Sequence, residues 1–230
     1  MAFNSIYTFF PFKSSEYFKE RKNKEYGGID NYLQRIESDV DCLLMEKRIK
    51  KNLFENKGKE GKLIILEGKA GTGKTTIIQK LIQNYRNSGK YFHYQNIEFE
   101  NFIHRNIQTI QRFLLEALQL AQLNQPSILI LENIDSIITT DQQGEFTLIA
   151  DQLAEYLVDL VSSIQANSNS HQIAFIITCK NINQLHKSLL TSFLLYDQIQ
   201  LLPPSTTQRI DVNFSHIFFP FLLKIFILDH

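Results

Sequence analysis

Several residue types are scarce in this chain, and each shortage excludes a class of protein. Two cysteines occur in 230 residues, and basic and acidic residues balance at 24 of each. Cys42 and Cys179 lie far apart and form no metal-binding spacing, so the sequence favours a reducing compartment over a disulfide framework. The neutral balance, with no basic tract, argues against a dedicated nucleic-acid binder, and we expect no nucleic-acid partner.

Long hydrophobic runs are also missing. No stretch reaches the roughly 18 to 20 apolar residues that a membrane-spanning helix needs. Residues 1–12 are rich in aromatic side chains but lack a basic start and are interrupted by Pro11, so they do not indicate a secretory signal. We therefore expect a cytoplasmic protein with a solvated or loosely ordered lead-in over residues 1–26. The length suits one domain with appendages.

The most informative stretch fits the pattern G-x-x-x-x-G-K-[ST] of a phosphate-binding loop. An apolar run at 62–66 precedes it and a helical apolar spacing follows over 75–87, which is the context that the motif requires. Glycines let several N–H groups turn towards one phosphate, and the following helix adds its dipole there. The residues expected to bind the nucleotide are Gly68, Lys69, Ala70, Gly71, Thr72, Gly73, Lys74, Thr75 and Thr76.

Further strands and helices alternate after this loop. The runs at 127–131 and 173–177 are apolar without alternation, as strands covered on both faces should be. Strands are also expected at 91–96 and 197–202, and helices at 106–123, 146–166 and, shorter, 185–191. This order predicts an α/β fold of the P-loop NTPase type, with a parallel sheet flanked by helices.

The strand at 127–131 ends where phosphate-loop ATPases carry the acid that holds magnesium, often followed by the carboxylate that activates water. Here the two positions hold Glu132 and Asn133. We expect Thr75 and Glu132 to hold Mg²⁺ beside bound ATP. Asn133 cannot accept a proton at neutral pH, and losing a positioned base typically costs on the order of 10²- to 10⁴-fold in rate. Asp135 is the nearest substitute.

Two other expected elements of hydrolysis are weak. Cys179 stands after the strand at 173–177, where such enzymes carry a polar residue between the terminal phosphate and the water, and a thiol is a poor hydrogen-bonding substitute. Lys180 or Asn181 could compensate only in part. An arginine supplied to a neighbouring subunit is worth roughly 10³- to 10⁵-fold, and none occurs between Leu189 and Leu202.

Taken together, these segments resemble an AAA-type ATPase module. The phosphate loop, the block at 125–137 and the run at 175–178 carry the resemblance, which covers residues 27–211. In more detail, the chain is similar to the first, degenerate AAA module of the peroxisome-biogenesis proteins. The similarity lies in the weakened second motif, which is Glu132-Asn133 in place of Asp-Glu, and in Leu185-His186, Pro203-Pro204 and Gln208-Arg209.

That resemblance implies an ATP-binding ring module that hydrolyses weakly or not at all. It implies a hetero-hexamer with a second AAA peroxin, which extracts a protein substrate, the import receptor, and is peripheral to the peroxisomal membrane. It also implies a helical lid after Arg209, which is missing. Residues 212–230 instead form an apolar tail, either a hook for a membrane or partner or the product of a truncated gene model.

Other interpretations remain open at this point. The chain could be an active AAA-type ATPase that remodels another protein and uses Asp135 as its base, or a clamp-loader type of ATPase with a basic face. Phe102-Ile103 could grip a translocating polypeptide or could simply pack in the core.

Overall fold

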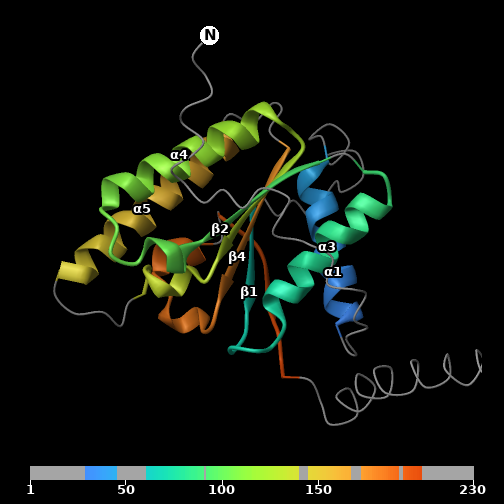
Figure 1. Ribbon diagram of the computed structural model, residues 1–230, viewed down its shortest axis with the longest axis horizontal. Helices are drawn as coiled ribbons and strands as arrows, with labels where there is room; N and C mark the ends of the chain where they lie inside the picture. The colour runs from blue at the N-terminus through green and yellow to red at the C-terminus, as the bar shows by residue number, and fades with distance from the viewer. Residues whose placement is uncertain are drawn as a thin grey trace, which may run out of the picture.

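The computed structural model describes residues 29–45, 61–90, 92–139, 145–166, 172–191 and 194–203. Within these residues the chain forms a three-layer α/β domain, with one parallel sheet between two layers of helices (Figure 1). The fold class expected from the sequence is therefore confirmed. None of the described helices is both long and apolar enough to cross a membrane.

The sheet has the spatial order β2-β3-β4-β1-β5, and every neighbouring pair of strands is parallel. The strands are β1 (Leu63–Glu67), β2 (His93–Glu98), β3 (Ser127–Glu132), β4 (Ile173–Cys179) and β5 (Leu195–Gln200). Because all strands run the same way, their carboxyl ends meet at one edge of the sheet. Glu98 there lies beside Glu132, and Glu67 lies beside Cys179.

Helices α1 and α3 lie on one face of the sheet, and α4 and α5 lie on the other (Figure 1). Their bounds are α1 (Asp30–Leu44), α3 (Lys74–Asn87), α4 (Ile107–Leu123) and α5 (Glu145–Ala166). Short 3-10 segments follow the strands at the carboxyl edge: η2 (Phe99–Phe102), η3 (Ile134–Ser136), η4 (Ile182–Gln184) and η5 (Lys187–Leu190).

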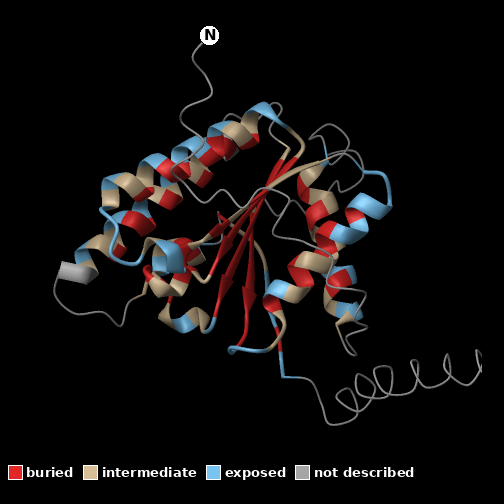
Figure 2. Cartoon of the chain, in the orientation of Figure 1, coloured by how far each residue is buried: buried red, intermediate tan, exposed pale blue. Residues whose placement is uncertain are grey.

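Each face of the sheet has its own apolar core, visible as the buried strands and inner helix faces in Figure 2. In β1, Leu63 and Ile65 pack towards α4 and α5, whereas Ile64 and Leu66 pack towards α1 and α3. Burying one such side chain stabilises the fold by about 1.5–3 kcal/mol. The strands are therefore held firmly in register, and so are the polar residues at their ends.

The boundaries of some elements differ from those expected. The edge strands run over 93–98 and 195–200, about two residues away from the expected ranges. The short helix expected at 185–191 is replaced by η4 and η5, because the side chains of Asn181 and His186 accept the N–H groups of Asn183 and Ser188 and start separate turns. The lead-in at 1–26 and the tail at 212–230 lie outside the described residues, so both remain predictions.

Candidate functional site

The phosphate loop joins the end of β1 to the start of α3 at the carboxyl edge of the sheet. Gly71 and Gly73 have φ angles of +82° and +95° there, a conformation that other residues adopt only with strain. Gly73 is the N-cap of α3 and has no side chain to accept the first N–H groups of the helix. These amides, together with the helix dipole, form a site suited to an anion such as phosphate.

Lys74 opens α3 and is folded back over the loop. Its side chain is buried, and its ammonium donates hydrogen bonds to the carbonyl oxygens of Gly68 and, at 3.2 Å, Lys69. Burial lowers the pKa of Lys74, whereas the nearby charge of Asp135 acts in the opposite direction. The lysine is thus held at the loop, where it can exchange these carbonyls for phosphate oxygens.

Glu132 ends β3 and is only 3% exposed. One carboxylate oxygen accepts a hydrogen bond of 2.8 Å from the hydroxyl of Thr75, and the other accepts one of 2.8 Å from the side-chain amide of Asn96. Burial raises the pKa of Glu132, and the hydrogen bonds from Thr75 and Asn96 partly offset this effect. Asn96 comes from β2, so three separate elements hold this carboxylate in place.

The same group of oxygens suits a magnesium ion. Mg²⁺ prefers oxygen ligands and usually takes one or two protein groups together with phosphates and water. The hydroxyl of Thr75 and the carboxylate of Glu132 lie within one hydrogen-bond length of each other beside the phosphate loop. The Oδ1 atom of Asn96 is buried and makes no hydrogen bond within the described residues, so it can accept one from a metal-bound water. These residues therefore fit the ion that the sequence predicts.

Asn133 occupies the position where related ATPases carry the base that activates water, and the chain changes direction at this residue, directly after β3. Its φ and ψ of 55° and 46° lie in the left-handed region, which Asn tolerates better than most residues. Its N–H donates a hydrogen bond of 2.9 Å to the hydroxyl of Thr178 in β4, and its carbonyl accepts the N–H of Ser136. Asn133 thus links two neighbouring strands through its backbone, and its side chain is an amide.

Asp135 lies in η3, directly after this turn. Its Oδ2 accepts the N–H of Lys180 at 2.9 Å, which ties the loop after β3 to the loop after β4. Its Oδ1 is buried and has no hydrogen-bond partner among the described residues. One oxygen of this carboxylate is therefore committed to the protein, and the other is available for a further contact.

Cys179 ends β4 and is fully buried in the core that faces α4 and α5. Burial, together with the charges of Asp135 and Glu67, raises its pKa to about 12, so the thiol is neutral. Its carbonyl oxygen accepts the N–H of Gly68 at 3.1 Å, and this contact braces the phosphate loop through the backbone.

The segment at Phe102 and Ile103 divides between core and surface. Phe102 packs against the core, with its ring centroid 5.1 Å from that of Phe113. Ile103 is 43% exposed. Sequence reasoning missed two other polar residues of this edge, Glu67 and Asn96, because each acts on a partner that is distant in the sequence. For the same reason it missed the contact of Thr178 with Asn133.

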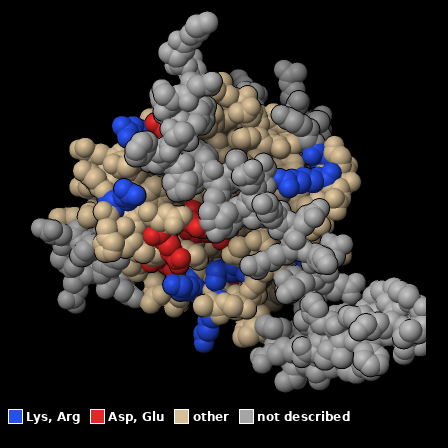
Figure 3. Space-filling model, viewed as in Figure 1, with Lys and Arg blue, Asp and Glu red and all other residues tan. Residues whose placement is uncertain are grey.

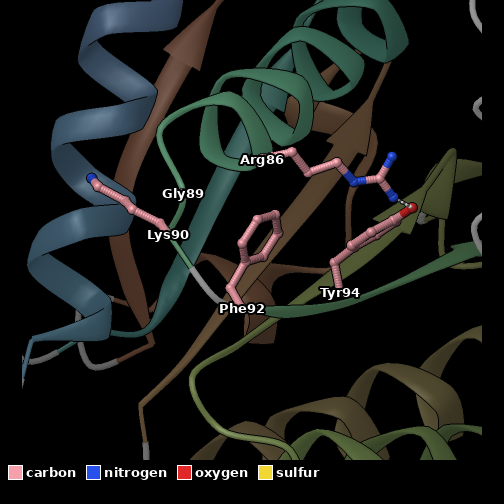
Figure 4. Close-up of a pocket in the computed structure, with 5 residues that line it drawn as sticks. All are labelled: Arg86, Gly89, Lys90, Phe92 and Tyr94. Atoms are coloured by element: carbon pink, nitrogen blue, oxygen red, sulfur yellow. Dashed lines mark hydrogen bonds between the residues drawn. The ribbon is translucent and has the colours of Figure 1, made fainter.

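An open pocket of about 370 Å³ lies away from the phosphate loop, where α3 ends and β2 begins (Figure 4). Its charged groups already have partners. The guanidinium of Arg86 bonds the hydroxyl of Tyr94 at 2.7 Å, and the ammonium of Lys90 forms an ion pair of 2.8 Å with Asp41. Phe92 packs edge-on against Tyr85 between them. These contacts fasten α3 to β2 and α1.

Acidic side chains gather in the middle of the face shown in Figure 3, with basic side chains directly beside them. Close to the magnesium position, the charges of Glu98 and Glu100 add to the rise in the pKa of Glu132. Carboxylates from β2 and η2 thus add negative charge around Glu132.

Comparison with known proteins agrees with this geometry. Over 153 residues the chain is 24% identical to proteins named "Peroxisomal ATPase PEX1" from Komagataella phaffii and Komagataella pastoris, which is 66% of this chain and 13% of each relative. Over 167 residues it is 23% identical to the "26S proteasome regulatory subunit 6B homolog" of Saccharomyces cerevisiae, which is 72% of this chain and 37% of that relative. The chain thus spans only a small part of these proteins.

The model of one protein family covers the phosphate loop, the strand that ends in Glu132 and the remainder of the sheet. This is the "ATPase family associated with various cellular activities (AAA)", and it matches residues 64–203, which is more than half of the chain. With a phosphate loop, a paired hydroxyl and carboxylate beside it and this strand order, the chain belongs to the AAA family.

Proposed function

We propose that this chain binds ATP with Mg²⁺ at the phosphate loop and hydrolyses it slowly or not at all. The observation that carries the proposal is the contrast between two neighbouring residues. Glu132 is a buried, doubly hydrogen-bonded carboxylate beside Thr75, whereas Asn133, which follows it, offers only an amide. The site in this proposal thus has a carboxylate and a hydroxyl that would bind Mg²⁺, but the next residue cannot accept a proton from water.

Each part of the loop has a separate task in nucleotide binding. The free N–H groups at the start of α3 hold phosphate oxygens, and Lys74 supplies a positive charge to them. Thr75 and Glu132 hold Mg²⁺, which neutralises phosphate charge when it is bound. Asn96 keeps the carboxylate of Glu132 oriented towards Thr75.

Hydrolysis is slow in this proposal because no described group at the site is a well-placed base. The amide of Asn133 has no proton affinity at neutral pH, and the thiol of Cys179 is neutral and buried. One carboxylate oxygen of Asp135 already accepts a hydrogen bond from the N–H of Lys180. The missing base corresponds to a loss on the order of 10²- to 10⁴-fold in rate.

We assign the chain to a peroxisomal protein-import complex that recycles the import receptor. The support is the 24% identity to proteins named as peroxisomal ATPases, over 66% of the chain, together with the degenerate second motif. In this proposal the module works on the cytoplasmic side of the peroxisomal membrane. It forms a hetero-hexamer with a second AAA peroxin, and its bound nucleotide stiffens the subunit interface.

The first test is a titration with fluorescently labelled ATP in the presence of Mg²⁺. We expect the wild type to bind, and Lys74→Ala to lose binding because it removes the buried cation of the loop. Lys187→Ala, at an exposed lysine on η5, serves as the control and should bind normally. Phosphate release by the wild type should stay near background. Rapid release that disappears in Asn133→Ala would overturn the proposal.

An active ATPase that remodels another protein is the second candidate. The free Oδ1 of Asp135 favours it, and so does the similarity to a proteasome regulatory subunit. Steady-state phosphate release separates the two candidates. Turnover that falls in Asp135→Asn while ATP binding persists would establish the active enzyme, and equal background rates support the binding module.

A further inference from the structure

Glu67 is a buried carboxylate directly behind the phosphate loop. It is the last residue of β1, lies between β4 and β5, and precedes Gly68, the first glycine of the loop. Its residue is only 9% exposed. None of the tasks described above for nucleotide binding uses this side chain.

Within the described part of the chain, the side chain of Glu67 makes hydrogen bonds with neutral groups. One carboxylate oxygen accepts the N–H of Ile182 and the other accepts the side-chain amide of Gln198, both at 3.3 Å. These bonds are longer than the 2.7–2.9 Å that is typical of a carboxylate paired with a cation. Within the described residues the structure shows no ion pair for Glu67, although buried carboxylates usually have one.

The field of an unpaired carboxylate extends beyond its hydrogen bonds. Glu67 has the buried residues Cys179 and Leu201 as neighbours, so little solvent screens its charge in those directions, whereas its other neighbour in the sheet, Gln200, is exposed. Its charge contributes to the raised pKa of Cys179, the neighbouring residue in the sheet. The backbone of Glu67 is also fixed, because its carbonyl accepts the N–H of Leu201 at 2.7 Å. This backbone contact and the two hydrogen bonds to the carboxylate together hold the negative charge at the end of β1, where the loop begins.

We propose that Glu67 sets the nucleotide preference of this site, because its fixed negative charge behind the loop weakens the binding of a nucleoside triphosphate more than that of a diphosphate. The inference rests on the proposed function, since it requires the loop to bind ATP. The triphosphate carries more negative charge, so the same carboxylate repels it more strongly. Glu67 would then lower the affinity for ATP and favour exchange of the nucleotide.

The test compares the affinities of labelled ATP and labelled ADP in three variants and the wild type. Glu67→Gln removes the charge and keeps an acceptor for the N–H of Ile182. Glu67→Asp keeps the charge, and Glu116→Gln makes the same change in net charge at an exposed position on α4. Urea unfolding of each variant checks that the fold is intact.

We expect Glu67→Gln to raise the ratio of ATP affinity to ADP affinity by about three- to tenfold. Two unit charges at a separation on the order of 10 Å, with an effective dielectric constant of about 20, interact strongly enough for a change on the order of tenfold, and salt reduces this effect. Glu67→Asp and Glu116→Gln should keep the wild-type ratio.

An unchanged or lower ratio in folded Glu67→Gln would overturn the inference and leave the proposed function in place, because a purely structural Glu67 would affect both nucleotides equally. If the folded wild type bound neither nucleotide, the proposed function would fail and this inference with it.

Discussion

Asn96 offers a sharp test of the magnesium position, because its side-chain amide supports the proposed metal ligand Glu132 directly. Replacing it in Asn96→Leu keeps the approximate size of the side chain and removes the donor of a 2.8 Å hydrogen bond to a carboxylate that is 3% exposed. Losing a hydrogen bond to a buried charged group costs about 1.5–3 kcal/mol. If this loss falls on magnesium binding, the gain in ATP affinity that Mg²⁺ provides should drop by roughly 10- to 100-fold.

The pH dependence of the variant provides an independent check on this reasoning. Burial already raises the pKa of Glu132 above its ordinary value of 4.5, and the bond from Asn96 holds that rise back. A raised pKa in the folded state means that stability is lost as pH rises from the unfolded value through the folded one. Removing the bond from Asn96 increases that loss. The destabilisation by Asn96→Leu should therefore be larger at pH 8 than at pH 4, where the carboxyl is mostly protonated in both states.

Two measurements decide the matter. Labelled ATP is titrated with Mg²⁺ and again with a chelator, and urea unfolding is recorded at both pH values. Asn101→Leu is the matched control, because Asn101 also donates a hydrogen bond to a glutamate, Glu98, at 3.1 Å, but from an exposed position. A Mg²⁺-dependent gain that is equal in wild type and Asn96→Leu would show that Glu132 is not the metal ligand.

Further predictions concern Asn133 and two glycines. Asn133→Asp should raise the rate of phosphate release, by up to about 10²-fold, because it supplies a carboxylate that can act as the base. Asn133→Glu should lower the free energy of unfolding in urea by about 1 kcal/mol more than Asn133→Asp does, because the φ of 55° at this position suits Asn and Asp better than Glu. Release that stays at background in folded Asn133→Asp would show that the base is not the only missing group. Gly61→Ala should destabilise the fold by several kcal/mol in thermal melts, because its added Cβ would lie 2.4 Å from the backbone carbonyl of Leu195, whereas Gly89→Ala meets no atom within 4 Å and should cost only about 1 kcal/mol for its positive φ. Equal losses in the two glycine variants would contradict the predicted steric clash.

The central strands and the phosphate loop could be predicted because their signals are local in the sequence. β3 and β4 are buried on both faces, so their sequences are continuous apolar runs. The loop motif needs its glycines at fixed spacing, and Gly71 and Gly73 indeed have positive φ. The edge strands β2 and β5 are only partly buried, so their patterns are weaker and their ends were misplaced by about two residues.

The polar support of the site could not be predicted, because it depends on the register between strands. Asn96 meets Glu132 across 36 positions, and Thr178 meets Asn133 across 45. Asn96 belongs to no motif. Thr178 ends the run at 175–178 that carries the family resemblance, but its contact with Asn133 cannot be predicted from that run. Only the parallel pairing of β2, β3 and β4 brings these side chains to one edge.

The charge balance at that edge explains why metal and nucleotide should bind together. Glu67 and Glu132 are both buried, and no ion pair to either occurs within the described part of the chain. Lys74 is the buried cation of the loop, and it already bonds backbone carbonyls. A triphosphate that enters without a metal ion adds negative charge to two carboxylates in a poorly screened place, which is unfavourable. Mg²⁺ reverses the sign of that interaction at Glu132, so the dependence of ATP binding on magnesium should be steep.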